Sequence, residues 1–370
     1  MDICNPFGKP FYIMSKPIGA MCNLKCDYCY YLHNSNHEVQ IMSDELLETF
    51  IKQYIESQSM PQVLFTWHGG EPMLRGIDFY KKVLQIEEKY AHGRVIDNVL
   101  QTNGILMTEE WAKFLHDNGF LVGISIDGPE EFHNAHRGNT FHKVIQAIEL
   151  LKEFDVMWNA MVVVSNTNAS HPKEVYDFFK RINAKYIQLT PLVRTNYLTN
   201  GFKGAINPLL WGDFLCKIFD EWMKEDVGEY YINIFDATLA NWMGETPGPC
   251  CFAPTCGQVG VIEYNGDVYS CDHFVYPEYK LGNIKEHTFI EMLFGEQQNK
   301  FGRNKWSTLP YKCRNCKYLF ACNGECPKNR YTENECGETG LNYLCEGYYK
   351  YFEHVAPFMT TMTNKKIPTD

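Results

Sequence analysis

Residues 22–30 read Cys-Asn-Leu-Lys-Cys-Asp-Tyr-Cys-Tyr, so three cysteines stand in the pattern C-x3-C-x2-C. The pattern follows an apolar run at 11–17, which we predict to be the first β-strand. Three closely spaced thiolates can bind three irons of a four-iron cluster and leave the fourth iron open to another ligand. The alternative is a zinc site that His33 or His37 completes. Both interpretations predict a metal centre just beyond the first strand.

Strand and helix patterns alternate from residue 10 to about residue 235. The β-like runs lie at 11–17, 63–67, 95–101, 121–126, 158–164 and 186–189. The amphipathic helical stretches lie at 43–57, 78–90, 108–118, 141–154, 172–182 and 208–224. Such repetition is typical of βαβ units around a parallel sheet, whose carboxyl edge gathers functional sites. Six repeats are too few for a closed eight-stranded barrel, so we expect a partial barrel or an open doubly wound sheet.

The bulk properties of the chain exclude several classes of function. Its 370 residues carry a net charge of −11, which would repel a nucleic-acid backbone. Apolar residues make up 45% of the chain, enough for a large core. No run approaches the roughly 18 apolar residues of a membrane span, and the first residues lack the pattern of a secretory signal. We therefore expect a cytoplasmic protein that binds neither nucleic acid nor membrane.

Fifteen cysteines are the most unusual feature of the composition. In a cytoplasmic chain of this size they favour metal binding over disulfides. Most of them follow residue 250, in a segment rich in Gly and Pro where helical periodicity fades. Residues 313–326 contain the pattern C-x2-C-x5-C-x3-C. We therefore predict a first domain at 1–235 and a cysteine-rich second domain at 236–370, folded around metal and ending in a helix.

A second motif gives the first cysteine pattern its meaning. Gly69-Gly70-Glu71-Pro72 stands at the end of the second predicted strand. In this order the two motifs resemble the radical S-adenosylmethionine (SAM) superfamily. The resemblance implies that Cys22, Cys26 and Cys29 hold a [4Fe-4S] cluster with SAM at its open iron. In that family the glycine turn contacts the amino group of SAM, and free backbone groups beside a carboxylate suit an ammonium ion.

The resemblance also implies a set of residues around SAM. Ser125 is the candidate for the ribose and Arg137 for the SAM carboxylate, although Arg137 also fits a surface charge. The full implied set is Tyr28, Gly69, Gly70, Glu71, Ser125, Arg137 and Val193.

The cysteine-rich segment resembles the SPASM extension of radical SAM peptide-modifying enzymes, and over nearly the whole chain the anaerobic sulfatase-maturating enzymes. The implied fold is a partial (β/α)6 barrel with an extension that binds two auxiliary clusters, giving three [4Fe-4S] clusters in all. The implied ligands of one auxiliary cluster are Cys250, Cys256, Cys271 and Cys326. Those of the other are Cys313, Cys316, Cys322 and Cys345.

Two positions depart from the family pattern. Cys251 adjoins Cys250, so either thiol is a candidate ligand, with Cys250 favoured by spacing. His68 precedes the glycine turn where some relatives have Gln. The cysteines that the cluster assignment leaves over are expected to be free thiols, namely Cys4, Cys216, Cys251 and Cys336.

The resemblance implies an oxidation driven by a 5′-deoxyadenosyl radical, which abstracts hydrogen from Cβ of a Cys or Ser in a sulfatase to give Cα-formylglycine. Loss of a second electron is easier once the substrate is deprotonated, so a base beside a cluster is expected. Asp272 follows Cys271 directly, and we expect negative charge nearby to raise its pKa. A turn or capping residue is the alternative interpretation of Asp272, and His273 and Tyr28 are alternative bases.

The implied partners are an unfolded or nascent sulfatase segment with a Cys/Ser-x-Pro-x-Arg motif and an electron donor such as flavodoxin or ferredoxin. Two other functions stay open at this point. One is a SPASM maturase that forms thioether or carbon–carbon links in a precursor peptide. The other is not an enzyme but a zinc-organised scaffold or an iron–sulfur electron carrier, which an iron assay would distinguish.

Overall fold

The structure is a computed structural model that describes residues 8–31, 40–193 and 205–364. Contacts divide the chain into two compact units, each built from several segments. Unit 1 comprises Met1–Ser125, Arg137–Trp158 and Gly257–Gly302. Unit 2 comprises Ile126–His136, Asn159–Cys256 and Arg303–Asp370. The predicted domain boundary at residue 235 stays a prediction.

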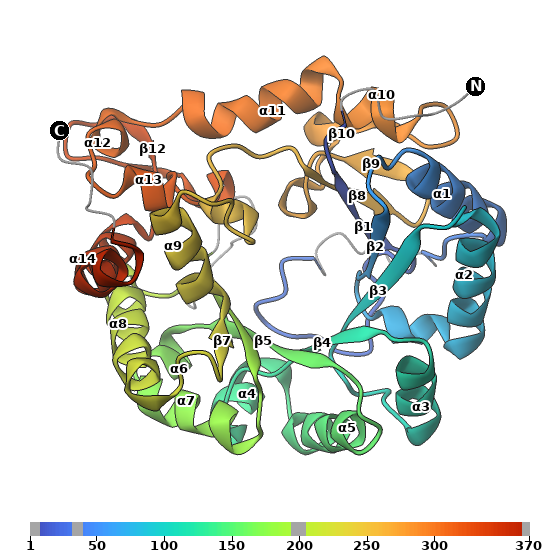
Figure 1. Cartoon of the computed structure of the whole chain (residues 1–370), viewed down its shortest axis with the longest axis horizontal. Helices are drawn as coiled ribbons and strands as arrows, with labels where there is room; N and C mark the ends of the chain where they lie inside the picture. The colour runs from blue at the N-terminus through green and yellow to red at the C-terminus, as the bar shows by residue number, and fades with distance from the viewer. Residues whose placement is uncertain (1–7, 32–39, 194–204, 365–370) are drawn as a thin grey trace. The chain divides into compact units, whose positions relative to one another are not determined.

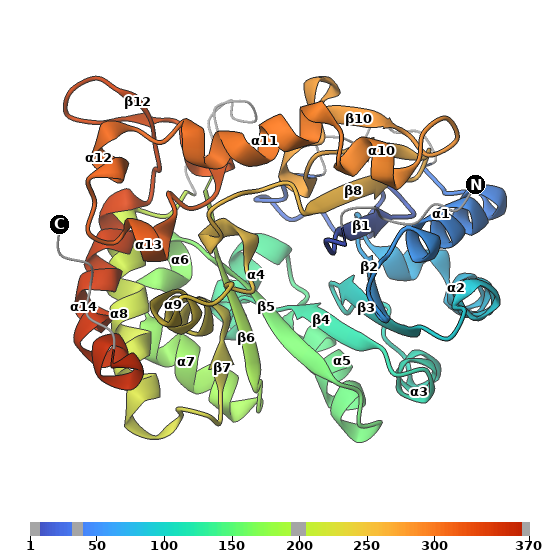
Figure 2. The same ribbon diagram turned by 45° about the horizontal axis from the view of Figure 1, so that its top comes forward.

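Unit 1 contains a sheet in which the strands follow the order β10-β9-β8-β1-β2-β3-β4. The strands are β1 (Tyr12–Lys16), β2 (Gln62–Trp67), β3 (Val95–Thr102), β4 (Leu121–Ser125), β8 (Val259–Glu263), β9 (Asp267–Tyr269) and β10 (Lys280–Asn283). Strands β8 and β1 to β4 are parallel, whereas β9 and β10 are antiparallel. Their register aligns Lys16 with Glu263 and Ser15 with Trp67, so the carboxyl ends of β8, β1 and β2 meet at one edge. Figure 2 shows β8 beside β1.

Unit 1 contains α-helices and short 3-10 helices, some of which begin at a side-chain cap. They are α1 (Asp44–Glu56), η2 (Pro72–Arg75), α2 (Ile77–Tyr90), α3 (Glu109–Asp117), α5 (Phe141–Glu153), η5 (Asp272–Phe274), η6 (Pro277–Tyr279) and α10 (Phe289–Leu293). Ser43 caps α1 by accepting the Leu46 N–H, and Thr108 caps α3. Figure 1 shows α1, α2 and α3 along the outer face of β1 to β4.

An aromatic core joins these helices to the sheet. Tyr54 of α1 meets Phe65 of β2 edge to face with ring centroids 5.0 Å apart, and Phe65 stacks on Trp67 at 5.9 Å. All three side chains are at most 1% exposed. Burial of one such side chain contributes roughly 1.5–3 kcal/mol, so this core anchors the strand ends that carry the predicted site.

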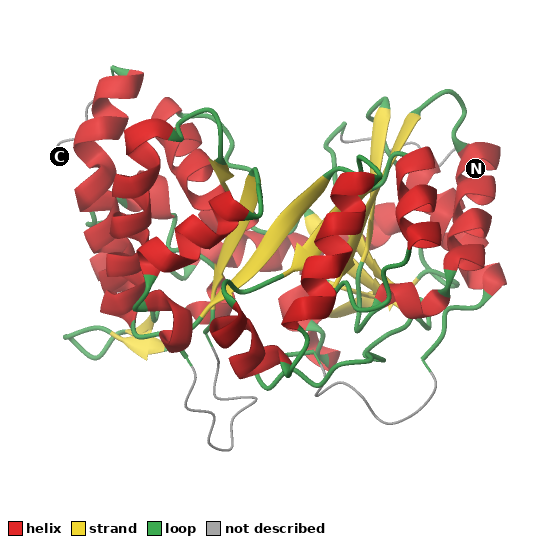
Figure 3. Ribbon diagram, turned by 90° about the horizontal axis from the view of Figure 1, so that it is seen from below, coloured by secondary structure: helices red, strands yellow, loops and turns green. Residues whose placement is uncertain are grey.

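Unit 2 contains three parallel strands in the order β5-β6-β7, followed by helices and short turns. The strands are β5 (Trp158–Val164), β6 (Tyr186–Pro191) and β7 (Tyr231–Ile232). The helices are α4 (Glu130–Arg137), α6 (Asn166–Ala169), α7 (Pro172–Arg181), α8 (Pro208–Glu225), α9 (Asn233–Met243), η4 (Cys250–Phe252), α11 (Glu296–Ser307, which begins in unit 1), α12 (Tyr311–Arg314), α13 (Leu319–Cys322), η7 (Pro327–Asn329) and α14 (Cys345–Thr363). A small hairpin pairs β11 (Thr332–Glu333) with β12 (Thr339–Leu341). Figure 3 shows the alternation of strands and helices by colour.

Helices α8 and α14 lie side by side (Figure 1) because two glycines let their backbones touch. A Cβ at Gly347 would lie 2.0 Å from the Pro208 carbonyl oxygen, and one at Gly212 would lie 2.6 Å from the Gly347 carbonyl oxygen. Any larger residue at Gly347 would therefore separate the two helices.

The six predicted β-runs and the six predicted helices between 10 and 235 are confirmed, as is the helix near the end of the chain. The segment rich in Gly and Pro after residue 250 also contains strands that were not predicted, because β8, β9 and β10 extend the sheet of unit 1. These strands are short and surrounded by Gly and Cys, which hid them. In the described ranges, every helix is too short or too polar to cross a bilayer.

Candidate functional site

The first three cysteines lie in the loop that follows β1, at the carboxyl edge of the sheet. Burial raises the pKa of the Cys22 thiol to about 11, and the charges of Cys26 and Cys29 act in the same direction. Glu71 adds to this effect, whereas the Leu24 N–H, which donates to Cys22 Sγ at 3.4 Å, opposes it. A thiol whose ionisation is hindered in this way suits a bound cation, because metal binding favours the thiolate form. The donor set therefore fits the predicted cluster.

The glycine turn packs against the backbone that leads into this cysteine loop. The Gly70 N–H donates to the Gly19 carbonyl at 2.7 Å, and the Glu71 N–H donates to the Met21 carbonyl at 2.9 Å. A Cβ at Gly70 would lie 2.0 Å from the Met21 oxygen. Gly69 has a φ of +128°, which side chains rarely adopt. The two glycines thus allow the end of β2 to support the cysteine loop.

Glu71 is buried beneath that turn, with 1% of its surface exposed. Its carboxylate accepts the Thr102 hydroxyl at 2.8 Å and the N–H groups of Asn103 and Met73 at 2.8 and 3.0 Å. Burial raises the pKa of Glu71 to about 7, against the effect of these hydrogen bonds. Glu71 therefore ties the ends of β2 and β3 together, a role that its motif alone did not reveal.

The other residues implied to surround SAM are distributed over both units. In unit 1, the Arg137 guanidinium lies 5.3 Å from the centroid of the Tyr28 ring, a cation–π contact with the cysteine loop. This contact favours a site role over the surface-charge interpretation of Arg137. The Ser125 hydroxyl accepts the Gln101 amide at 3.3 Å. Val193 lies in unit 2, just after β6, and is 6% exposed.

Asp272 belongs to unit 1 and lies at the start of η5, directly after Cys271. Its carboxylate forms an ion pair with Lys16 Nζ and accepts the Tyr30 hydroxyl. Only 12% of the Asp272 side chain is exposed. The first strand, the cysteine loop and the segment after β9 thus meet at this carboxylate.

Lys16 was not predicted as a site residue. It ends β1, is fully buried, and its Nζ lies 3.4 Å from the centroid of the Tyr31 ring. The Tyr31 hydroxyl in turn donates to both carboxylate oxygens of Glu263, at 2.7 and 2.6 Å. The one available signal was a lysine at the end of an apolar strand, because a buried lysine needs a partner.

The prediction of a raised pKa for Asp272 was wrong. Burial has the largest single effect and by itself would raise this pKa, but the positive charge of Lys16, its hydrogen bond to the carboxylate and the charges of nearby histidines together outweigh burial. His273 and His68 act in the same direction as Lys16, and the pKa lies well below its usual range. Negative charge from the neighbouring cluster was expected to raise this pKa. The opposing cation, Lys16, could not be foreseen, because the pairing of β1 with β8 brings it close.

His68 follows β2 and lies near the Lys16–Asp272 pair. Its Nδ1 accepts the Gly69 N–H at 2.7 Å, so the neutral ring carries its proton on Nε2. Burial lowers the pKa of His68, and Lys16 lowers it further while Asp272 opposes this. His68 therefore presents a neutral N–H donor beside the Lys16–Asp272 pair.

The four cysteines predicted to hold one auxiliary cluster lie together in unit 2. We name them the 313-group: Cys313, Cys316, Cys322 and Cys345. Burial raises the pKa of the Cys322 thiol, and the charges of the other three thiols raise it further. Leu309, Leu319 and Leu341 pack around Cys313 and Cys345 and shield the group from water. This arrangement fits a cluster in an apolar pocket.

A second set of thiols in unit 2, the 250-group, comprises Cys250, Cys251, Cys256 and Cys326. Burial raises the pKa of the Cys326 thiol to about 12, and the charges of Glu325 and Cys256 add to this. Burial also raises the pKa of Cys251, with contributions from Cys250 and Cys326, so both adjacent cysteines are candidate ligands. Cys271, the remaining predicted ligand, belongs to unit 1.

The leftover cysteines and the zinc alternative are partly covered by the structure. Cys216 is buried in α8, and Cys336 is exposed. Cys4, His33 and His37 lie outside the described residues. Within the described ranges, no three His, Cys, Asp or Glu side chains converge on a single metal ion. Thiolates that bind different irons of one cluster do not need to converge in this way.

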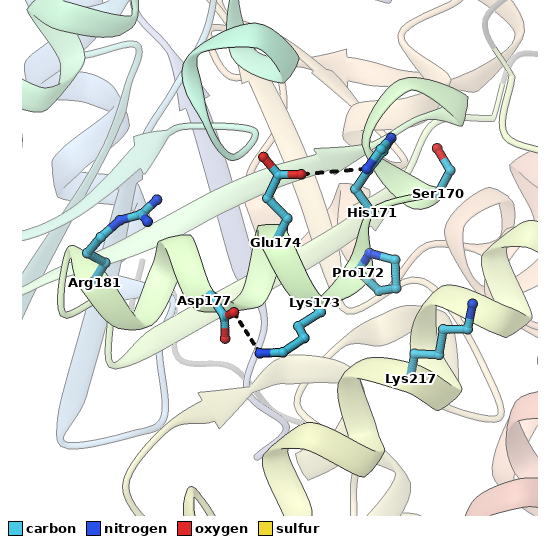
Figure 4. Close-up of a pocket in the computed structure, with 8 residues that line it drawn as sticks. All are labelled: Ser170, His171, Pro172, Lys173, Glu174, Asp177, Arg181 and Lys217. Atoms are coloured by element: carbon cyan, nitrogen blue, oxygen red, sulfur yellow. Dashed lines mark hydrogen bonds and ion pairs between the residues drawn. The ribbon is translucent and has the colours of Figure 1, made fainter.

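A groove of about 550 Å³ lies along α7 in unit 2 (Figure 4). It is lined by Ser170, His171, Pro172, Lys173, Glu174, Asp177, Arg181 and Lys217. Its charged side chains pair with each other, His171 with Glu174 and Lys173 with Asp177. The groove contains none of the predicted site residues.

Two family models match the chain. The model of the radical SAM superfamily covers residues 17–179, and the SPASM model, described as an iron–sulfur cluster-binding domain, covers residues 250–317.

Curated relatives and solved structures extend over nearly the whole chain. A serine-type anaerobic sulfatase-maturating enzyme of Bacteroides thetaiotaomicron is 56% identical, over 96% of this chain and 92% of that protein. A cysteine-type enzyme of Clostridium perfringens is 33% identical, over 96% of this chain and 99% of that protein. The structure of native anSMEcpe with bound AdoMet and Kp18Cys peptide matches with a TM-score of 0.88 at 34% identity, covering 96% of this chain and 99% of that one. Streptococcus suis SuiB bound to S-adenosylmethionine, at 16% identity, 92% and 78% coverage and a TM-score of 0.65, shares the fold alone.

Proposed function

The chain belongs to the family of radical SAM anaerobic sulfatase-maturating enzymes, and from this premise we propose which residue it oxidises and which of its side chains do so. Its activity is the oxidation of a sulfatase residue to formylglycine. The predicted fold class, a partial radical SAM barrel with a SPASM extension, is confirmed. The zinc scaffold, the electron carrier and the peptide-crosslinking enzyme are therefore set aside.

The residue oxidised is serine. The observation that carries this proposal is the 56% identity with a serine-type enzyme, against 33% with a cysteine-type enzyme over the same share of the chain. The partner is an unfolded or nascent sulfatase segment in the cytoplasm, held in an extended conformation through its backbone. A solved relative with a bound peptide supports this mode of binding. A flavodoxin or ferredoxin would donate the electrons.

SAM and iron–sulfur clusters are the cofactors of the family, and we propose three [4Fe-4S] clusters for this chain. Cys22, Cys26 and Cys29 would hold the first. The 313-group would hold one auxiliary cluster, and the other would take its ligands from the 250-group and Cys271. When bound, these cofactors supply hydrogen abstraction from the substrate carbon and an acceptor for the second electron; the side chains described above supply the rest.

Asp272 is the proposed base for the substrate hydroxyl. Its carboxylate is ionised at neutral pH, because the ion pair with Lys16 keeps its pKa low. A hydroxyl on a radical-bearing carbon is more acidic than an ordinary alcohol, so a weak but fully ionised base is sufficient. Lys16 and the Tyr30 hydroxyl fix the orientation of the carboxylate. The low pKa thus makes Asp272 a weak base, but one that is fully ionised at neutral pH.

Two peptides test the substrate assignment. They differ only in Ser or Cys at the first position of the x-Pro-x-Arg motif and are incubated with the anaerobically reconstituted enzyme, SAM and reductant. Mass spectrometry counts the formylglycine formed from each. We expect a higher kcat/KM for the serine peptide. Conversion of the cysteine peptide alone would overturn the serine proposal.

A further inference from the structure

Lys305, on α11, is a fully buried cation in unit 2. Its ammonium donates to the backbone carbonyls of Cys250 and Cys251, at 2.8 and 2.7 Å. No carboxylate within the described ranges forms an ion pair with it. Burying an ammonium without an opposite charge is strongly disfavoured. The buried Lys305 therefore indicates a negatively charged partner that is not a carboxylate.

Arg330 follows η7 and is held in the same way. Its guanidinium makes four hydrogen bonds between 2.5 and 3.2 Å, all to backbone carbonyls: those of Asn323, Gly324, Glu325 and Lys305. The carbonyl of Lys305 joins the two cations into one structure. Carbonyls orient a guanidinium but do not neutralise its charge.

The turn that carries three of these carbonyls is unusual. Asn323, Gly324 and Glu325 all lie in the left-handed region, with φ of 48°, 70° and 52°. Only glycine adopts this conformation without strain. A Cβ at Gly324 would also lie 2.3 Å from Arg330 Nη2. The turn between Cys322 and Cys326 is therefore built around the guanidinium.

The Glu325 carboxylate hydrogen-bonds to neither cation within the described ranges, although its charge opposes the lowering of the Arg330 pKa that burial causes. Its side chain is 4% exposed and accepts the amides of Asn329 and Asn342, at 2.9 and 2.6 Å. Only its backbone carbonyl reaches Arg330.

Both cations lie against the backbone of predicted cluster ligands: Lys305 binds the carbonyls of Cys250 and Cys251, and Arg330 binds the turn between Cys322 and Cys326. Burial raises the pKa of Cys250 and Cys256, and Lys305 opposes this rise at both. Arg330 opposes it at Cys256, in the 250-group, and at Cys313, in the 313-group. Lys305 thus faces one set of predicted ligands, whereas Arg330 faces both.

We propose that Lys305 and Arg330 are built-in counter-ions of the two auxiliary clusters and set their reduction potentials, Lys305 for the cluster of the 250-group and Arg330 for both clusters. The inference rests on the proposed function, because it takes the two cysteine groups as cluster ligands. Both residues are positioning residues that act on bound clusters through charge.

The physical reason is the change in charge on reduction. A four-iron core with four thiolates is an anion, and one electron from the external donor makes it more negative by one charge. A buried cation stabilises the reduced form more than the oxidised form, so it raises the reduction potential. Arginine keeps its charge at every accessible pH, which suits a permanent effect.

The experiment uses full-length protein with Cys22, Cys26 and Cys29 replaced by Ala, so that only auxiliary clusters remain. Iron and sulfide are counted after anaerobic reconstitution, and the clusters are then titrated potentiometrically with detection by electron paramagnetic resonance. Lys305→Met is expected to lower one of the two potentials, and Arg330→Gln both. We expect roughly tenfold changes in the reduction equilibrium, or about 59 mV for a one-electron couple.

Charge-conserving variants and a surface control separate charge from structure. Lys305→Arg and Arg330→Lys should restore potentials close to those of the parent protein. Lys300→Met removes a charge from the exposed face of the same helix and should shift neither potential. If Arg330→Gln takes up no iron, the Lys305 variants decide the outcome.

Two failures can be told apart. The parent protein is expected to hold about eight irons, four per cluster. Zinc instead of iron, or no more than four irons, would contradict the proposed cluster ligands. Full iron content with unchanged potentials in Lys305→Met would overturn the counter-ion inference alone.

Discussion

Lys16 in unit 1 and Lys305 in unit 2 are both fully buried, yet their ammonium groups meet different kinds of partner. Lys16 contacts the Asp272 carboxylate and the face of Tyr31. Within the part of the chain that the structure describes, the Lys305 ammonium donates hydrogen bonds to carbonyl oxygens alone. The Asp272 carboxylate balances the charge of Lys16. Backbone carbonyls orient the Lys305 ammonium, and an anionic cluster bound to the cysteines would balance its charge. A buried cation without a carboxylate can therefore indicate the charge of a cofactor.

The largest effect should come from removing the carboxylate that balances Lys16. Asp272→Asn keeps the size of the side chain but removes the proposed base, so formylglycine formation should fall by roughly 10²–10⁴. Radical generation does not need this base, and deoxyadenosine should still form. Mass spectrometry measures both products in one reaction.

Asp267→Asn is the matched control for that experiment. Asp267 lies on β9 and pairs with Lys280, so its loss should leave formylglycine formation close to normal. Near-normal formylglycine in Asp272→Asn would direct the search to another base, such as His273 or Tyr28. Loss of iron in that variant would show a structural role.

The second effect concerns the Lys16 side of the same pair. Lys16→Met leaves the Asp272 carboxylate buried without its cation, which should cost about 3–5 kcal/mol of unfolding free energy. Lys16→Met/Asp272→Asn removes both charges and should recover part of that loss. Anaerobic denaturant unfolding of the reconstituted proteins measures the difference.

Lys82→Met serves as its control, because Lys82 forms an exposed pair with Asp44 and little change is expected. If the double variant is less stable than Lys16→Met alone, the buried pair is not the origin of the loss.

The smallest effect should come from Glu87, a buried carboxylate in unit 1 that faces neither a cation nor a predicted cluster. It is 3% exposed; Oε2 accepts the Asn98 amide at 2.9 Å, and Oε1 has no hydrogen-bond partner among the described residues. Burial raises the pKa of Glu87 to about 8. The folded state therefore holds a proton that the unfolded state releases near its ordinary pKa, and stability falls as the pH rises toward 8.

Glu87→Gln removes this titration. The variant should be more stable than the wild type at pH 8, by roughly 1–3 kcal/mol, and its stability should depend less on pH. Thermal unfolding between pH 6 and 8 measures both properties. Parallel pH profiles for the two proteins would contradict the assignment.

Local sequence signals predicted most of the fold. The predictions of a helix at 43–57 and of a strand at 63–67 needed only nearby residues, and both are confirmed. The strand Val259–Glu263 was missed, because five residues beside glycines and cysteines give a weak pattern and its pairing with β1 joins distant parts of the chain.

The site was predicted where chemistry follows from residue type and spacing. The cysteine spacing at 313–326 indicated a metal site, the family resemblance implied the 313-group as its ligands, and the four thiols of this group do lie together. Lys16 and Arg330 could not be recognised, because their partners depend on strand register in one case and on carbonyl orientation in the other. Because the contact with Lys16 was not foreseen, the direction predicted for the pKa of Asp272 was wrong.

The contact between α8 and α14 has a consequence for how the protein is made. Helix α14 begins at Cys345. Two residues further along the helix, Gly347 packs against Pro208. The last thiol of the 313-group thus takes its position only when α14 has docked on a segment synthesised long before. A ribosome must have translated α14 before that docking can occur. We therefore expect iron to enter this group only after α14 has been made, and a premature stop before Cys345 to yield a chain that cannot complete the group.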